Sequence, residues 1–139
     1  MAYVSQDRKA KLAPAIKAVL KKHGVKGTLA VRNHSTLVLN IKSGSIDFIE
    51  NFIKTDDTAR QRMSAEQVAY IRKNQSLDVN VYWYKEHFSG QALKFLSEVI
   101  PAMNNGNHDN SDIQTDYFDV GWYIDVNIGR WNKPYVCAA

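Results

Sequence analysis

The side chains of this chain that could do chemistry are mainly Lys and Arg, and they gather at one end. Residues 1–42 hold nine of them against a single acid, Asp7, whereas the remaining residues hold nine against thirteen acids. Clustered cations bind polyanions because they displace counterions from a phosphate backbone. We therefore expect the basic end to contact nucleic acid or a nucleoprotein, through the following residues: Lys17, Lys21, Lys22, Lys26, Arg32 and His34.

The other potentially reactive residues lack the neighbours in sequence that a catalytic or metal site would need. A general base or a phosphate contact is conceivable at His34, beside Arg32 in an expected turn, but a histidine in a turn is usually only solvated. The polar segment 104–112 offers oxygen and imidazole groups without the residue order of a calcium-binding loop. Cys137 has no neighbour that would activate a thiolate. No metal, cofactor or catalytic residue is therefore predicted, and an enzyme is the least favoured class.

Length and composition indicate one folded domain over residues 1–139. The chain is 45% hydrophobic and 11% aromatic, which is enough apolar surface for a single core, and it is too short for two ordinary domains. Its single cysteine excludes an internal disulfide and is typical of a reducing, cytosolic setting. It has no signal-peptide pattern and no run of about 18 apolar residues, so no membrane contact is expected.

Apolar spacing predicts helices in three places, namely from Ser5 or Asp7 to His23, at 64–74 and at 91–103. Pro14 requires the first helix either to start near residue 13 or to bend there, and Pro101 is expected to break the last one. Ser64 and Gln67 are spaced as a capping box. The segment 46–53 fits either a helix or an extended strip.

Alternating apolar residues predict strands at 28–32, 36–41, 77–83 and 122–128. The first two are joined by three polar residues, 33–35, and are expected to form a hairpin. The order of elements predicts an α+β fold, a two-layer sandwich in which helices pack on one face of a four-stranded, mostly antiparallel sheet.

The polar positions of these strands all fall on one side of the expected sheet. Antiparallel sheets commonly have a solvated outer face, and this is the first interpretation. The alternative is a polar binding surface, which would consist of Arg32, Asn40, Asp78, Asn80, Asp125 and Asn127.

Two stretches resemble phage and mobile-element proteins of a large polyvalent protein-associated domain family. They are Val25–Ile41, which reads VKGTLAVRNHSTLVLNI, and the C-terminal part from DYFD at 116–119 through GRWNKPY at 129–135. The resemblance covers nearly the whole chain. It implies a cytoplasmic role in an infected or element-carrying bacterial cell, where such proteins help an incoming element to establish itself, sometimes by countering host defence. It carries no catalytic residue.

A second function class is therefore a protein-binding inhibitor of a host defence complex, similar in role to an anti-CRISPR protein. Its contact surface would be the polar loop at 104–119 and the aromatic C-terminal segment, with four expected anchors: Tyr117, Phe118, Trp131 and Tyr135. This class predicts binding that tolerates salt, whereas contact with phosphates predicts binding that weakens steeply with salt. The oligomeric state does not follow from the sequence.

Overall fold

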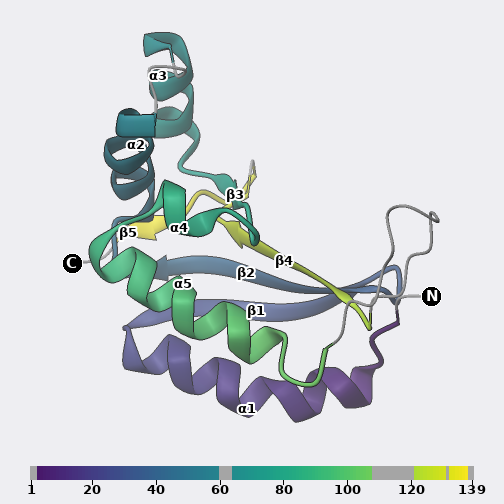
Figure 1. Ribbon diagram of the computed structural model, residues 1–139. Coiled ribbons are helices and arrows are strands. Elements are labelled where there is room, and N and C mark those ends of the chain that lie inside the picture. Colours follow the sequence, from purple (N-terminus) through teal and green to yellow (C-terminus); the bar gives the residue numbers. More distant parts are fainter. Residues whose placement is uncertain (1–2, 60–63, 108–120, 131, 138–139) are drawn as a thin grey trace, which may run out of the picture.

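The computed structural model describes residues 3–59, 64–107, 121–130 and 132–137. Its helices are α1 (Gln6–Lys22), α2 (Phe48–Ala59), α3 (Ala65–Asn74), α4 (Tyr84–His87) and α5 (Gly90–Met103). Its strands are β1 (Val25–Arg32), β2 (Thr36–Gly44), β3 (Leu77–Val79), β4 (Tyr123–Ile128) and β5 (Val136–Cys137). Figure 1 shows their arrangement.

The strands form one open sheet in the order β1-β2-β4-β3, and β5 pairs with the end of β2. The outer pairs β1–β2 and β3–β4 are antiparallel, whereas the central pair β2–β4 is parallel. The predicted α+β class is confirmed. The sheet is mixed because β4 comes from far along the chain and enters beside β2 in the same direction.

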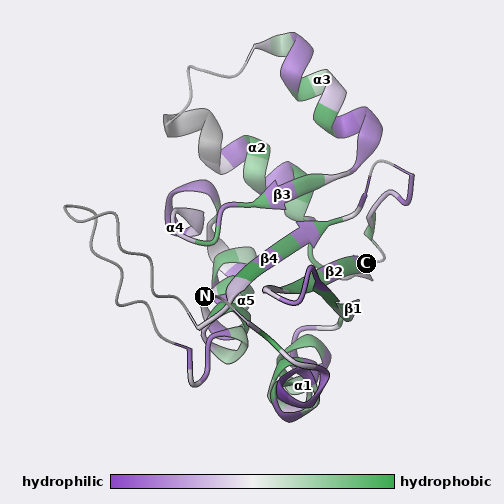
Figure 2. Cartoon of the chain, turned by 90° about the vertical axis from the view of Figure 1, so that its right-hand side faces the viewer, coloured by the Kyte–Doolittle hydropathy of each residue, from purple (hydrophilic) through white to green (hydrophobic). Residues whose placement is uncertain are grey.

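Helices α1 and α5 cover one face of this sheet. Their apolar stripes meet the inward side chains of β2 and β4 in a single core, as the amphipathic spacing predicts. The central fully buried members include Ile16, Leu37, Leu39, Phe95 and Val126. Figure 2 shows α4 and α5 on one side of the strands, α2 and α3 beyond the edge strand β3, and no described helix over the opposite face of β1, β2 and β4, which we call the helix-free face. None of the described helices has the length and apolar character needed to span a membrane.

The structure excludes one of the two alternatives for Pro14 and corrects the break expected at Pro101. Ser5 accepts a hydrogen bond from the Arg8 amide at 3.0 Å, so α1 begins at Gln6 and runs through Pro14 rather than starting near residue 13. The helix tolerates this proline because Pro14 is exposed, and water can satisfy the carbonyl that loses its amide partner. Pro101 is also exposed, and α5 continues past it to Met103.

Two further local predictions have different outcomes. The capping box of Ser64 and Gln67 is confirmed, with both of its hydrogen bonds present. The strand expected to reach residue 83 ends at Val79, because Asn80 Oδ1 accepts hydrogen bonds from two following amides and turns the chain. Most of the segment 46–53, which the sequence left ambiguous, lies in α2 (Phe48–Ala59), so it is helical rather than extended.

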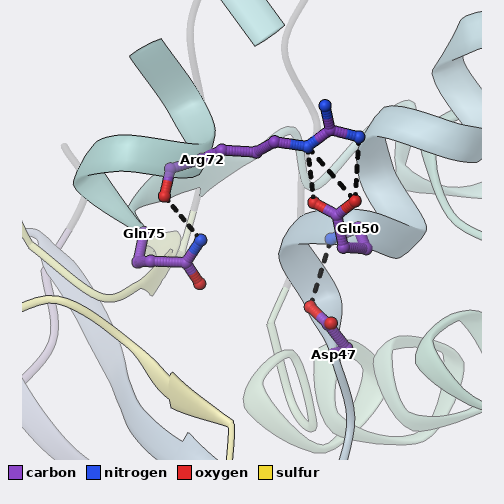
Figure 3. A network of polar contacts seen from close by, with 4 residues as sticks. All are labelled: Asp47, Glu50, Arg72 and Gln75. Atoms are coloured by element: carbon purple, nitrogen blue, oxygen red, sulfur yellow. Dashed lines mark hydrogen bonds and ion pairs between the residues drawn. The ribbon is translucent and has the colours of Figure 1, made fainter. Parts of the chain in front are cut away.

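Helix α3 packs against the core through the partly buried Val68 and Ile71, and an exposed ion pair joins it to α2. It has no fully buried residue, whereas α2 places Phe48 and Ile49 in the core. Arg72 of α3 donates from Nε and Nη2 to the Glu50 carboxylate, at distances between 2.9 and 3.2 Å (Figure 3). The hydrogen bond from Arg72 holds the pKa of Glu50 below its ordinary value. The pair therefore favours the observed orientation of α3 at neutral pH.

Candidate nucleic-acid interface

The sheet face away from α1 and α5 carries a row of polar side chains. Thr28, Asn40, Asn127 and Asp78 stand opposite one another across β1, β2, β4 and β3. Asp125 lies two residues from Asn127 and so points to the same side. The predicted sharing of one face by these polar positions is confirmed, except for Asn80, whose side chain is used in the turn after β3.

Hydrogen bonds connect this row across three strands. Arg32 Nη1 donates to Asp125 Oδ2 at 3.0 Å, and Asn127 Nδ2 donates to Asn40 Oδ1 at 3.2 Å and to Asp125 Oδ2 at 3.5 Å. Partial burial and the nearby Asp125 raise the pKa of Asp78, and Arg32 opposes this effect. The face is thus an ordered polar surface that brings two carboxylates close together.

Two adjoining hollows open on this face. The acidic hollow, of about 450 Å³, contains both carboxylates and is lined by Arg32, Ser76, Leu77, Asp78, Asp125, Asn127, Gly129 and Arg130. The basic hollow, of about 320 Å³, has no acid in its lining, which consists of Asn40, Ile41, Lys42, Ser43, Gly129, Arg130, Lys133, Pro134 and Val136. Gly129 and Arg130 belong to both, so the two hollows form one continuous surface.

Three cations meet at the basic hollow because of the parallel pairing of β2 with β4. Ile128 stands opposite Ile41, so the residues that follow these two positions lie at the same end of the sheet. Lys42 is the extra residue of a β-bulge in β2, where the register with β1 shifts. After Gly129, reciprocal backbone hydrogen bonds of 2.8 and 3.0 Å join Arg130 and Lys133 in a tight turn.

The three cations Lys42, Arg130 and Lys133 are exposed, and none forms an ion pair with another residue in the part of the chain that the structure describes. Their charges are therefore available to an anionic ligand. The sequence prediction missed this set because its members come from two distant segments, one of them in the more acidic part of the chain. The bulge and the turn that unite them depend on long-range pairing.

Comparison with family models, with curated proteins and with solved structures finds no match to this chain. What this face binds must therefore follow from its own side chains. On this open sheet face the cationic groups can bind a phosphate, and the neighbouring amides and carboxylates can accept hydrogen bonds from donors next to that phosphate.

The structure divides the six predicted nucleic-acid contacts between two sides of the molecule. Lys17 and Lys21 are exposed on α1, on the helix-covered side. Lys22, also on α1, is bound to Glu98, with its Nζ 2.6 Å from Oε1. Lys26 and Arg32 lie on β1 at positions that alternate with core residues, so they face the opposite side of the sheet. The basic end is not one surface.

Other predicted site residues also have defined places. His34 is exposed in the β1–β2 turn with φ +57° and does not line the acidic hollow with the two carboxylates. Tyr135 is 3% exposed, and its hydroxyl donates to the Ile46 carbonyl at 2.6 Å. It is a core residue, which corrects its assignment as a contact anchor. Tyr117, Phe118 and Trp131 lie outside the described residues.

Catalytic chemistry gains no support from this arrangement. A general-base role for His34 would need an acidic partner in the same pocket, and His34 does not line the acidic hollow that holds Asp78 and Asp125. Among the described residues there is no group of three or more His, Cys, Asp or Glu side chains that could hold a metal ion.

Replacing Asp78 with asparagine is expected to raise the free energy of unfolding at neutral pH, by at most about 0.5 kcal/mol because the side chain is exposed. The folded pKa of Asp78 lies above its unfolded value, so the ionised carboxylate destabilises the native state. The gain should diminish as the pH falls through the folded pKa and vanish below the ordinary value of about 3.9, where both states are protonated. Urea denaturation over this pH range measures it.

Glu50→Gln is the matched control of opposite sign. The folded pKa of Glu50 is lowered, so its ionised form stabilises the native state above its unfolded pKa and this contribution disappears as the pH falls through the folded pKa. The variant should lose stability at neutral pH and match the wild type in acid. Equal pH dependence in the two variants would contradict the assignment of their environments.

Proposed function

We propose that this protein is a non-enzymatic accessory factor of a phage or mobile element that binds single-stranded nucleic acid, free or within a host nucleoprotein. The observation that carries the proposal is the basic hollow, where Lys42, Arg130 and Lys133 converge without an acid on the helix-free face of the sheet. Exposed cations in a concave surface attract phosphates, because the hollow focuses their positive electrostatic potential.

Single strands fit this face better than duplexes. A strand whose bases are unstacked can lie across an open sheet and place bases on exposed aromatic rings. Tyr123 is 44% exposed at the start of β4 and belongs to the row that contains Arg32 and Thr36. The amides of Asn40 and Asn127 add hydrogen-bonding groups farther along the same face, four residues from Tyr123 in the register of β2 and β4. The face thus combines phosphate contacts, a stacking surface and polar groups.

The proposal is tested by comparing two triple variants that remove equal charge. One is Lys42→Gln, Arg130→Gln and Lys133→Gln in the basic hollow, and the other is Lys11→Gln, Lys17→Gln and Lys21→Gln on the exposed side of α1. Fluorescence anisotropy with a short oligouridine at several salt concentrations gives affinity and salt slope. The hollow variant should bind at least about tenfold more weakly, and its salt slope should fall by about 2, as loss of three phosphate contacts requires.

The α1 variant should keep the wild-type affinity within about threefold, since only general electrostatic attraction is reduced. A larger loss in the α1 variant than in the hollow variant would place the interface on α1. No binding of any single strand at low salt would refute nucleic-acid binding by the free protein.

A second candidate function, a protein-binding inhibitor of a host defence complex, is supported by two exposed aromatic residues. Tyr82 and Trp83, in the turn after β3, are 78% and 57% exposed, whereas the neighbouring Tyr84 and Phe88 are buried. Tyr and Trp frequently dominate protein interfaces. A host complex that the wild type retains at high salt, and that Tyr82→Ser with Trp83→Ser releases, would favour this candidate.

A further inference from the structure

The two hollows offer different chemistry to a single ligand. The basic hollow presents three cations, and the acidic hollow beside it presents the carboxylates of Asp78 and Asp125. Arg130 lines both hollows, so one ligand can place an anionic group in the basic hollow and a neighbouring group in the acidic hollow. A nucleotide has this arrangement, with an anionic phosphate attached to a sugar that can carry hydroxyl donors.

The carboxylates retain acceptor capacity towards such donors. Asp125 accepts hydrogen bonds from Arg32 and Asn127, which leaves about two of its four lone-pair positions open. The Asp78 carboxylate accepts no hydrogen bond from another described residue. Carboxylates accept from hydroxyl groups strongly, because a hydrogen bond to a charged acceptor is about twice as strong as a neutral one.

We propose, on the basis of the proposed function, that this face prefers RNA to DNA, with a phosphate in the basic hollow and the 2′-hydroxyl donating to Asp78 or Asp125. The 2′-hydroxyl is the group by which a protein distinguishes the two polymers. A deoxyribose brings no donor to the acidic hollow. The two carboxylates then repel the phosphates of the DNA strand, and no hydrogen bond compensates for this repulsion.

The test compares three strands with the same bases: oligouridine, oligodeoxyuridine and 2′-O-methyl oligouridine. Identical bases remove any contribution from base contacts to the ratio of affinities. The methylated strand keeps the 2′-oxygen and carries a methyl group in place of the donated hydrogen, whereas the deoxy strand loses the whole hydroxyl and adds no bulk. Weaker binding of both strands therefore identifies the lost donor rather than a steric clash. The full-length wild type should bind oligouridine about tenfold more tightly than either other strand, as one hydrogen bond to a charged acceptor implies.

The double variant Asp78→Asn and Asp125→Asn should reduce this ratio to about threefold or less, because the amide oxygen of asparagine accepts a hydrogen bond only about half as strong as one to a carboxylate. Its overall affinity for all three strands should rise through the loss of negative charge. Glu50→Gln with Glu66→Gln removes the same charge from α2 and α3 and should keep the ratio. An equal affinity of the wild type for all three strands, or an unchanged ratio in the Asp variant, would overturn the RNA preference while leaving nucleic-acid binding intact. Failure to bind any of the strands would overturn both proposals.

Discussion

Phe95→Ala is expected to lower the free energy of unfolding by about 3–5 kcal/mol, the usual range for removing a large aromatic side chain from a core. Phe95 is fully buried in α5. Its ring meets Phe48 edge-on, with 5.5 Å between ring centroids, and His23 at 5.4 Å. These partners come from α2 and from the end of α1, so the cavity would weaken contacts among three elements. Since small proteins are stable by about 5–15 kcal/mol, a large share would be lost.

Tyr70→Ala provides the matched control, because Tyr70 is also a helical aromatic residue but is 70% exposed on α3. Its replacement should change stability by no more than about 0.5 kcal/mol. Urea denaturation followed by circular dichroism measures both variants. Similar losses in the two would contradict the core assigned to α5.

The second large effect is expected for Gly129→Ala, at the junction of the two hollows. Gly129 has φ +66°, and an added Cβ would lie 2.4 Å from the Gln75 carbonyl oxygen and 2.6 Å from the Tyr135 amide nitrogen. These two backbone groups are hydrogen-bonded to each other at 2.8 Å. Relief of the clash would separate them, so we expect a loss of about 3 kcal/mol or more, from strain and overpacking together.

Gly90→Ala separates the clash from the backbone preference. Gly90 has φ +57°, but no atom lies within 4 Å of an added Cβ, so only the conformational cost of about 1–2 kcal/mol is expected. Thermal or urea denaturation compares the two variants. Under folding conditions, Gly129→Ala should also weaken oligouridine binding, because Arg130 and Lys133 would move, while Gly90→Ala should not. Equal losses of stability in the two variants would contradict the expected clash, because they would show that the backbone around Gly129 can move apart without cost.

The elements that depend on neighbours in sequence could be predicted. Ser5 caps the start of α1 through its own side chain, and Asn33 and His34 adopt positive φ in the turn of the predicted hairpin. Alternation placed Asn40 and Asn127 on one face, which their register across β2 and β4 confirms. In each case the deciding interaction lies within a few residues or follows from the two-residue repeat of a strand.

The basic hollow could not be predicted in this way. Lys42 reaches it through a bulge, and Arg130 reaches it because β4 runs parallel to β2. A parallel pair needs a long connection whose outcome no local pattern fixes. Burial of Tyr135 likewise depends on a distant partner, the carbonyl of Ile46. A count of charge along the chain predicts one basic end over residues 1–42. Folding instead divides those cations between α1 and the other side of the sheet, where Lys42 meets Arg130 and Lys133.

The central claim is that the helix-free sheet face, and not the outer side of α1, contacts nucleic acid. Backbone amide chemical shifts of the isotope-labelled protein, recorded while oligouridine is added, test it most directly. The account predicts the largest changes at residues 40–43 and 125–130, with little change at residues 11–21 of α1. Changes concentrated on α1, or none at any amide, would contradict it.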